Sequence, residues 1–172
     1  GASSGIGKST AVMLAREGHQ IIATSRHKKN LDSLIDESRS FGGCIVPEEL
    51  NINKSDEVER CFERLFANFG EIDVLINNAG YGLKGSINSI TIEQLRDQFD
   101  TNLFASVSTI KAVLPRMIER EDGCIINITS ILGRIATPFM GAYASSKFAL
   151  EGISEAMRVE LAPYGVRVCV VE

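Results

Sequence analysis

Short apolar runs alternate with amphipathic stretches along the whole chain. Runs of strand length that are rich in apolar and β-branched residues predict strands at 21–24, 44–50, 74–76, 125–128 and 166–171. Apolar residues that recur every three or four positions predict helices over 6–17 and 29–41, from an N-cap at Ser55, from an N-cap at Thr91, and over 141–161. The helix after Thr91 is long, and Pro115 is expected to kink it or end it because proline lacks the N–H that a helix needs.

The regular alternation of strand and helix predicts a single α/β domain over residues 1–172. Parallel strands need helical crossovers, so we expect a doubly wound, Rossmann-like parallel sheet in a three-layer α/β/α arrangement. The chain begins inside a glycine turn, which needs a strand before it, and ends within an apolar run. We therefore expect a fragment that is incomplete at both ends. In the common strand order 3-2-1-4-5-6 the first strand is central, so this chain alone should fold poorly.

Composition narrows the classes of partner. Apolar residues make up 44% of the chain and charged residues 23%, an ordinary globular balance, and the net charge of -4 offers no basic surface for nucleic acid. No apolar run is long enough to cross a bilayer. The four cysteines form no CxxC pair. We expect them to be buried free thiols in a reducing compartment, hence a cytoplasmic location, rather than disulfides or a metal site.

The first seven residues form a glycine-rich turn just before a predicted helix. Glycine permits a tight turn and lets backbone N–H groups approach a pyrophosphate, and the helix N-terminus adds positive potential. Such a turn by itself is more often only a turn, but the strand at 21–24 follows at the distance that a dinucleotide site requires. The candidate cofactor-binding residues here are Gly1, Ser3, Ser4, Gly5, Ile6 and Gly7.

The residues after the strand at 21–24 bear on the choice of cofactor. An NAD site usually places an acid there, to bind the ribose 2′-hydroxyl. This chain has no acid among residues 24–29 and instead offers Ser25 and Arg26, which suit a 2′-phosphate. A solvated basic turn is the alternative. We expect NADP, with NAD the less favoured cofactor.

Tyr143 and Lys147 are four residues apart within a predicted helix and therefore share a face. A free tyrosine has a pKa near 10, and a nearby ammonium lowers it by favouring the phenolate. Such a pair can exchange a proton with an alcohol or a carbonyl, although in isolation it is more often a surface pair. Ser130 follows the strand at 125–128, and carboxyl ends of parallel strands are where ligand groups gather. Asn102 lies inside the long helix, where a satisfied structural amide is the simpler interpretation.

Together these residues resemble the short-chain dehydrogenase/reductase family. The matching motifs span nearly the whole chain in the family's order and spacing. They are Gly1-x-x-x-Gly5-x-Gly7, Asn77-Asn78-Ala79-Gly80, Asn102, Ser130 and Tyr143-x-x-x-Lys147.

The resemblance implies a role for each matched residue. Tyr143 would be the acid/base, and Lys147 would lower its pKa and hold the nicotinamide ribose. Ser130 would bind and polarise the substrate oxygen, and Asn102 would hold a water in a proton relay to Lys147. The segment after the strand at 74–76 would support the sheet and line the adenosine side of the cleft: Asn77, Asn78, Ala79 and Gly80. Hydride would pass between the nicotinamide and the substrate carbon without a metal.

The resemblance also implies features beyond the motifs. Many members have Asp after the third strand, where this chain has Asn51, which can accept a hydrogen bond but carries no charge. Members form homodimers or homotetramers through their counterparts of the long helix and the Tyr143 helix. The sequence around Lys147 is similar to members that act on hydrophobic alcohols such as steroids and retinol. Apolar residues between Ser130 and Tyr143 either floor an apolar substrate pocket or are buried loop residues: Ile131, Leu132, Ala136, Pro138, Phe139 and Met140.

Three functions remain in competition. The leading hypothesis is an oxidoreductase acting on a small carbonyl or secondary alcohol. A non-catalytic NADP-binding redox regulator is the second, but it would not need a proton donor. An epimerase or dehydratase using the same tyrosine is the third, and it would not consume NADPH stoichiometrically.

Overall fold

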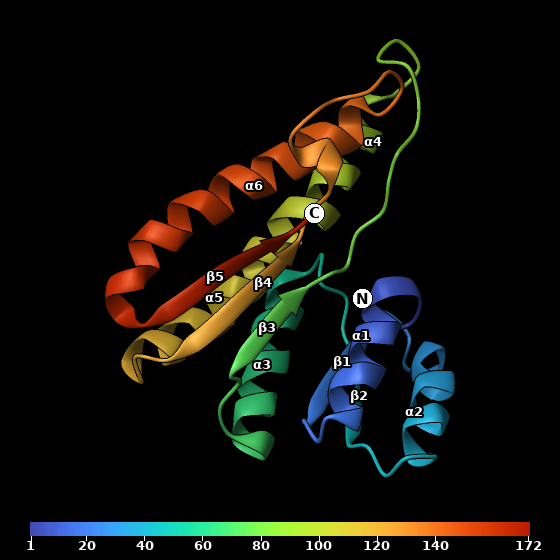
Figure 1. Ribbon diagram of the computed structural model, residues 1–172. Helices are drawn as coiled ribbons and strands as arrows, with labels where there is room; N and C mark the ends of the chain where they lie inside the picture. The colour runs from blue at the N-terminus through green and yellow to red at the C-terminus, as the bar shows by residue number, and fades with distance from the viewer. The chain divides into compact units, whose positions relative to one another are not determined.

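Five parallel strands alternate with six α-helices in the computed structural model, which describes all 172 residues (Figure 1). The chain divides into two compact units, residues 1–51 and 52–172. The strands pair as β1–β2 in one unit and as β3–β4–β5 in the other. These are the two sets that remain when the first strand is taken from the predicted order 3-2-1-4-5-6. The assignment of 1–172 to one domain stays a prediction.

The first unit is a parallel strand pair with two helices. Its elements are α1 (Gly5–Arg16), β1 (Ile21–Ser25), the 3-10 helix η1 (Lys28–Leu31), α2 (Asp32–Arg39) and β2 (Ile45–Glu49). The core joins α1 to β1 through small residues, since Ala11, Ala15 and Ala23 are all nearly inaccessible. Leu31 and Leu34 are fully buried in the same cluster. Alanine allows this close approach, so the start of α1 is held firmly beside the end of β1.

The second unit is a three-stranded parallel sheet with helices. Its strands are β3 (Val74–Asn77), β4 (Gly123–Ile128) and β5 (Val166–Val171). Its helices are α3 (Ser55–Phe69), α4 (Ile92–Phe99), the π-helix η2 (Asp100–Phe104), α5 (Ala105–Glu119), the 3-10 helix η3 (Ile131–Gly133), α6 (Gly141–Leu161) and the 3-10 helix η4 (Ala162–Tyr164). In the register, Leu75 pairs with Ile125 and Ile125 with Val168, and all three side chains are buried. Thr109 of α5 and Ser154 of α6 bond to Asn77 and Asn127, which are two residues further along β3 and β4 and so face the same side, and these two helices cover that face (Figure 1).

The long predicted helix is divided into α4, η2 and α5 by a π-helical turn. Thr91 caps α4 as predicted, in a capping box whose Thr91 Oγ1 accepts from the Gln94 N–H at 3.2 Å. The prediction that Pro115 could end the helix is wrong, because α5 continues to Glu119. Burial outweighs the lost hydrogen bond there, since the flanking Val113 and Met117 are each 1% exposed.

Two further expectations need correction. Ser55 is the first residue of α3 rather than its N-cap, because the extended Lys54 takes the cap position and its carbonyl accepts from the Val58 N–H at 3.0 Å. All four cysteines are free, but only two are buried: Cys44 and Cys169 are exposed. Cys169 is exposed because alternation along β5 turns its side chain away from the buried row that holds Val168. None of the helices combines the length and apolar character that a membrane span requires.

Candidate active site

The glycine turn is tied to the end of β1. The N–H of Ala2 donates to the carbonyl of Thr24 at 3.1 Å. Gly5 begins α1 with φ of +55°, in the left-handed region that glycine adopts without strain. This geometry places the turn at the carboxyl end of a parallel strand, where α/β proteins bind ligands.

The start of α1 has unused capacity for an anion. Ser4 is the N-cap, yet its side chain makes no capping hydrogen bond, and no acidic residue lies in the first turn. Ser4, Gly5 and Ile6 are exposed, whereas Ser3 and Gly7 are half-buried. The N–H groups and the positive end of the helix dipole are therefore left for a ligand, and this arrangement fits the pyrophosphate of a dinucleotide.

Exposed basic side chains follow β1, and Arg26 is the first of them. Arg26 is exposed, while Ser25 is 8% exposed and its carbonyl accepts from the Leu50 N–H at 2.9 Å. Sequence reasoning missed Glu49, which the register of β1 and β2 places opposite Ser25. Its carboxylate accepts from the Lys28 N–H at 2.8 Å and is thus engaged at the start of η1. Asn51 is half-buried just beyond β2.

Tyr143 and Lys147 lie one turn apart on α6, as predicted. The Lys147 Nζ is 5.9 Å from the centre of the Tyr143 ring. Tyr143 is half-buried, and Lys147 is only 5% exposed. Burial lowers the pKa of Lys147, because desolvation disfavours the ammonium. Nζ donates to the carbonyl of Ile128 at 2.8 Å, which directs the lysine toward the end of β4.

Ser130 lies just beyond β4 and forms the N-cap of η3. Its Oγ accepts from the Leu132 N–H at 3.2 Å, and its side chain is half-buried. The hydrogen bond from Lys147 to the Ile128 carbonyl, two residues before Ser130, therefore joins the Ser130 segment to α6.

Asn102 is fully buried within η2, and its amide is fully engaged by protein groups. Its Oδ1 accepts from the Tyr81 N–H at 3.1 Å, and its Nδ2 donates to the Tyr81 carbonyl and to Ser146 Oγ, both at 3.0 Å. This is the satisfied structural amide anticipated as the simpler interpretation. Its water-holding role stays a prediction. A β-carbon added at Gly80 would lie 3.0 Å from Asn102 Oδ1 and 3.7 Å from Lys147 Nζ, so a larger residue there would press on the Asn102 amide.

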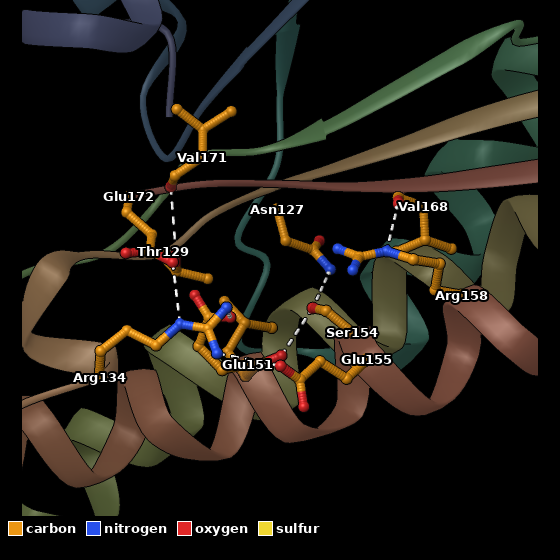
Figure 2. A network of polar contacts seen from close by, with 11 residues as sticks. Asn127, Thr129, Arg134, Glu151, Ser154, Glu155, Arg158, Val168, Val171 and Glu172 are labelled. Carbon is orange, nitrogen blue, oxygen red and sulfur yellow. Dashed lines mark hydrogen bonds and ion pairs between the residues drawn. The ribbon is translucent and has the colours of Figure 1, made fainter.

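A series of hydrogen bonds between polar side chains links neighbouring strands and helices, and it extends the predicted role of Asn77 in supporting the sheet. Thr109 Oγ1 donates to Asn77 Oδ1 at 2.7 Å, and Asn77 Nδ2 donates to Asn127 Oδ1 at 2.9 Å. Asn127 Nδ2 in turn donates to Ser154 Oγ at 2.8 Å (Figure 2). These hydrogen bonds connect α5, β3, β4 and α6. Sequence reasoning missed Asn127, whose signal was a polar residue inside an apolar strand.

Replacing Asn127 by alanine is expected to lower the free energy of unfolding by about 2–4 kcal/mol, because it removes the acceptor of the Asn77 amide and the donor to the buried Ser154 hydroxyl and leaves a cavity. Urea denaturation of the complete protein measures this. Asn68→Ala, at an exposed position on α3, serves as the matched control and should stay within about 0.5 kcal/mol of wild type. Equal losses in the two variants would contradict the bridging role.

Gln98 is a second residue that sequence reasoning missed. It is fully buried one turn before Asn102, and its Nε2 donates to the Tyr81 carbonyl at 2.8 Å. Its Oε1 accepts from the Leu83 N–H at 2.7 Å. The two amides thus hold the segment after Gly80 from one side. Gly82 of that segment approaches Tyr143, since a β-carbon added there would lie 3.7 Å from Tyr143 Cδ2.

The segment between Ser130 and Tyr143 exposes large apolar side chains. Ile131 is 62% exposed, Ile135 58% and Phe139 67%. Ala136 and Pro138 are also exposed, and Leu132 and Met140 are half-buried. The interpretation of these side chains as buried loop residues is therefore wrong for most of them.

Comparison with known proteins identifies the family. The profile of the family described as short chain dehydrogenase matches residues 1–172. The chain belongs to the short-chain dehydrogenase family. A 3-ketodihydrosphingosine reductase of Bacteroides thetaiotaomicron is 41% identical over 172 residues, which are 100% of this chain and 60% of that protein. Human retinol dehydrogenase 8 is 36% identical over 178 residues, covering 100% of this chain and 56% of that protein.

Solved structures of short-chain dehydrogenases share the fold. A metagenomic short-chain oxidoreductase in complex with NADP superposes with a TM-score of 0.95 and 31% identity, covering 99% of this chain and 77% of that one. The Rossmann-like α/β class predicted from the alternation of strand and helix is thereby confirmed. This chain spans about 60% of the length of the curated short-chain dehydrogenase relatives named above.

Proposed function

We propose that the complete protein carrying this chain is an NADP-dependent oxidoreductase that interconverts a carbonyl and a secondary alcohol. The observation that carries the proposal is the pair on α6: Tyr143 with a buried lysine 5.9 Å from its ring, beside the strand end that bears Ser130. An ammonium beside a phenol can stabilise the negative charge that proton transfer leaves on the phenol oxygen.

Each residue of the pair has a defined task. In the reductive direction, Tyr143 donates its hydroxyl proton to the substrate oxygen while Ser130 Oγ hydrogen-bonds to that oxygen. Lys147 stabilises the phenolate left on Tyr143, and the Ile128 carbonyl holds the ammonium in place. A bound nicotinamide supplies the hydride. In the oxidative direction, the phenolate removes the proton from the alcohol.

Two observations support NADP. The uncapped start of α1 fits a pyrophosphate, and the exposed Arg26 is the first cation after β1 that could bind a 2′-phosphate. Glu49, whose carboxylate could accept from a ribose 2′-hydroxyl, directs one oxygen to the Lys28 N–H. A similar solved oxidoreductase is described in complex with NADP. We propose that the remaining cofactor contacts come from Gly1, Ser3, Ser4, Gly5, Ile6, Gly7, Ser25, Asn51, Asn78, Ala79, Gly80, Tyr143 and Lys147.

Exposed apolar side chains between Ser130 and Tyr143 support a hydrophobic substrate. Ile131, Ile135 and Phe139 are each more than half exposed in that segment. The two curated relatives named above are called a 3-ketodihydrosphingosine reductase and a retinol dehydrogenase, and both names specify hydrophobic substrates. We also propose a homodimer or homotetramer, which the exposed Phe104 of η2 and Phe148 of α6 support.

The test is a substrate screen of the complete protein. Oxidation of NADPH and NADH is followed by absorbance with a series of 2-ketones of increasing chain length, and with the matching secondary alcohols in the reverse direction. We expect NADPH-linked reduction whose kcat/KM rises with chain length. NADPH bound without turnover would favour the redox regulator, and product formed without net NADPH consumption would favour the epimerase or dehydratase.

A further inference from the structure

We propose that Arg134 is a positioning residue that sets the place of Ser130 relative to the Tyr143–Lys147 turn. This inference rests on the proposed function for its effect on turnover. Arg134 lies four residues after Ser130, at the end of η3. Its three guanidinium nitrogens face three different carboxylates, those of Glu151, Glu155 and Glu172 (Figure 2). We call these four residues the Arg134 clamp.

The clamp joins three parts of the fold. Nε of Arg134 donates to Glu172 at 2.9 Å, just beyond β5, and Nη1 donates to Glu155 on α6 at 3.0 Å. Nη2 lies 3.1 Å from Glu151 Oε2, one turn beyond Lys147 on α6. The segment after Ser130 is thus fastened at once to the helix that carries Tyr143 and to the end of the neighbouring strand.

Glu151 gives the clamp its strength. The Glu151 carboxylate is buried, with 3% of the residue exposed, and neither of its oxygens accepts a hydrogen bond. The contact with Arg134 is therefore an ion pair by distance without hydrogen-bond geometry. A buried charge without a partner is strongly destabilising, whereas the pairs with the exposed Glu155 and Glu172 contribute little. The guanidinium is thereby held at the surface of α6.

Close packing next to that ion pair fixes the position of η3 on α6. A β-carbon added at Gly133 would lie 3.0 Å from Glu151 Cγ and 3.3 Å from the carbonyl of Lys147. The end of η3 therefore rests on the same turn of α6 that carries the lysine. Because the Leu132 N–H donates to Ser130 Oγ at 3.2 Å, the seating of η3 also orients the serine hydroxyl.

The other end of the same segment is fastened independently. Lys147 Nζ donates to the Ile128 carbonyl at 2.8 Å, and the Thr129 N–H donates to the Val171 carbonyl at 2.8 Å. The Thr129 hydroxyl donates to the same carbonyl at 3.1 Å (Figure 2). Without the clamp, only the packing of Gly133 on α6 described above would oppose movement of Ser130 away from the strand side. The Arg134 clamp supplies the second anchor, and a hydroxyl held at both sides keeps the geometry that proton transfer requires.

The experiment uses the complete protein with the best ketone from the screen and compares Arg134→Gln, the double variant R134Q/E151Q and the control Arg60→Gln. Arg60 lies on α3 in an exposed pair with Asp56. We expect kcat to fall about 10- to 100-fold in Arg134→Gln and in the double variant, with KM for NADPH changed less than about twofold. Arg60→Gln should match wild type.

The double variant separates positioning from charge compensation. It removes the unpaired buried carboxylate, so its thermal midpoint should recover toward wild type, and it keeps the test valid where Arg134→Gln alone fails to fold. If kcat recovers together with the midpoint, Arg134 only neutralises Glu151 and the proposal is overturned.

Amide hydrogen exchange tests the clamp without reference to activity. In R134Q/E151Q, exchange in peptides spanning residues 129–135 should accelerate about tenfold or more while peptides of α5 keep their wild-type rates. Unchanged exchange at 129–135, or accelerated exchange with unchanged kcat, overturns the proposal. If wild type reduces no carbonyl, the proposed function fails, and the exchange result still decides whether Arg134 holds the Ser130 segment.

Discussion

Tyr143→Phe is expected to lower kcat for carbonyl reduction by about 1,000-fold or more, while NADPH affinity stays within about twofold. The substitution removes only the hydroxyl group, whose proton the substrate oxygen receives, and it keeps the ring that lies beside Gly82. Lys147 also keeps its hydrogen bond to the Ile128 carbonyl, so the end of β4 is undisturbed. Steady-state kinetics gives kcat, and fluorescence titration of NADPH gives the affinity.

Tyr164→Phe is the matched control for Tyr143→Phe. Tyr164 lies in η4, is 47% exposed and is not part of the site. Its variant should keep wild-type kcat. Comparable activity in Tyr143→Phe and wild type would show that another group delivers the proton, and the proposed mechanism would then be wrong.

Arg26→Asp is expected to move cofactor preference from NADP toward NAD by about 100-fold or more in the ratio of the two kcat/KM values. The guanidinium lost from the end of β1 forms charge-assisted contacts to a 2′-phosphate, each of which contributes about 1.5–3 kcal/mol. The new carboxylate repels that phosphate and accepts a hydrogen bond from a ribose 2′-hydroxyl. The loss of contacts to NADP and the gain of a contact to NAD therefore change the ratio of kcat/KM values in the same direction.

Arg39→Asp controls for the change in net charge. Arg39 ends α2 in the same unit, and its side chain is 75% exposed in a surface pair with Asp36. The ratio for this variant should equal that of wild type. If Arg26→Asp also leaves the ratio of the two kcat/KM values unchanged, the basis for preferring NADP is removed.

Elements with strong local signals could be predicted from the sequence. The strand at 166–171 has the predicted bounds because β-branched residues and the preceding Gly165 specify it locally. The helix over 141–161 is also as predicted, and it places Tyr143 and Lys147 on one face through helical periodicity alone. The π-helical turn inside the predicted long helix left no such signal, because it depends on how Asn102 meets Tyr81, which is 21 residues earlier.

Residues that act through long-range contacts were the ones missed. Asn127 and Gln98 were not singled out, since each bonds to groups far along the chain, such as Ser154 and Leu83. Arg134 looks like an ordinary surface charge in the sequence. Only folding brings Glu151 and Glu172 to it, from 17 and 38 positions away.

By itself, the sequence determined the order of elements and the family and supplied the candidate residues for the chemistry, because periodicity and motif spacing are local properties of the chain. The tertiary structure alone decided that Lys147 is buried against the Ile128 carbonyl and that Arg134 holds the segment after Ser130. Burial and ion pairing depend on which distant groups exclude water from a side chain. No local pattern of residues contains that information.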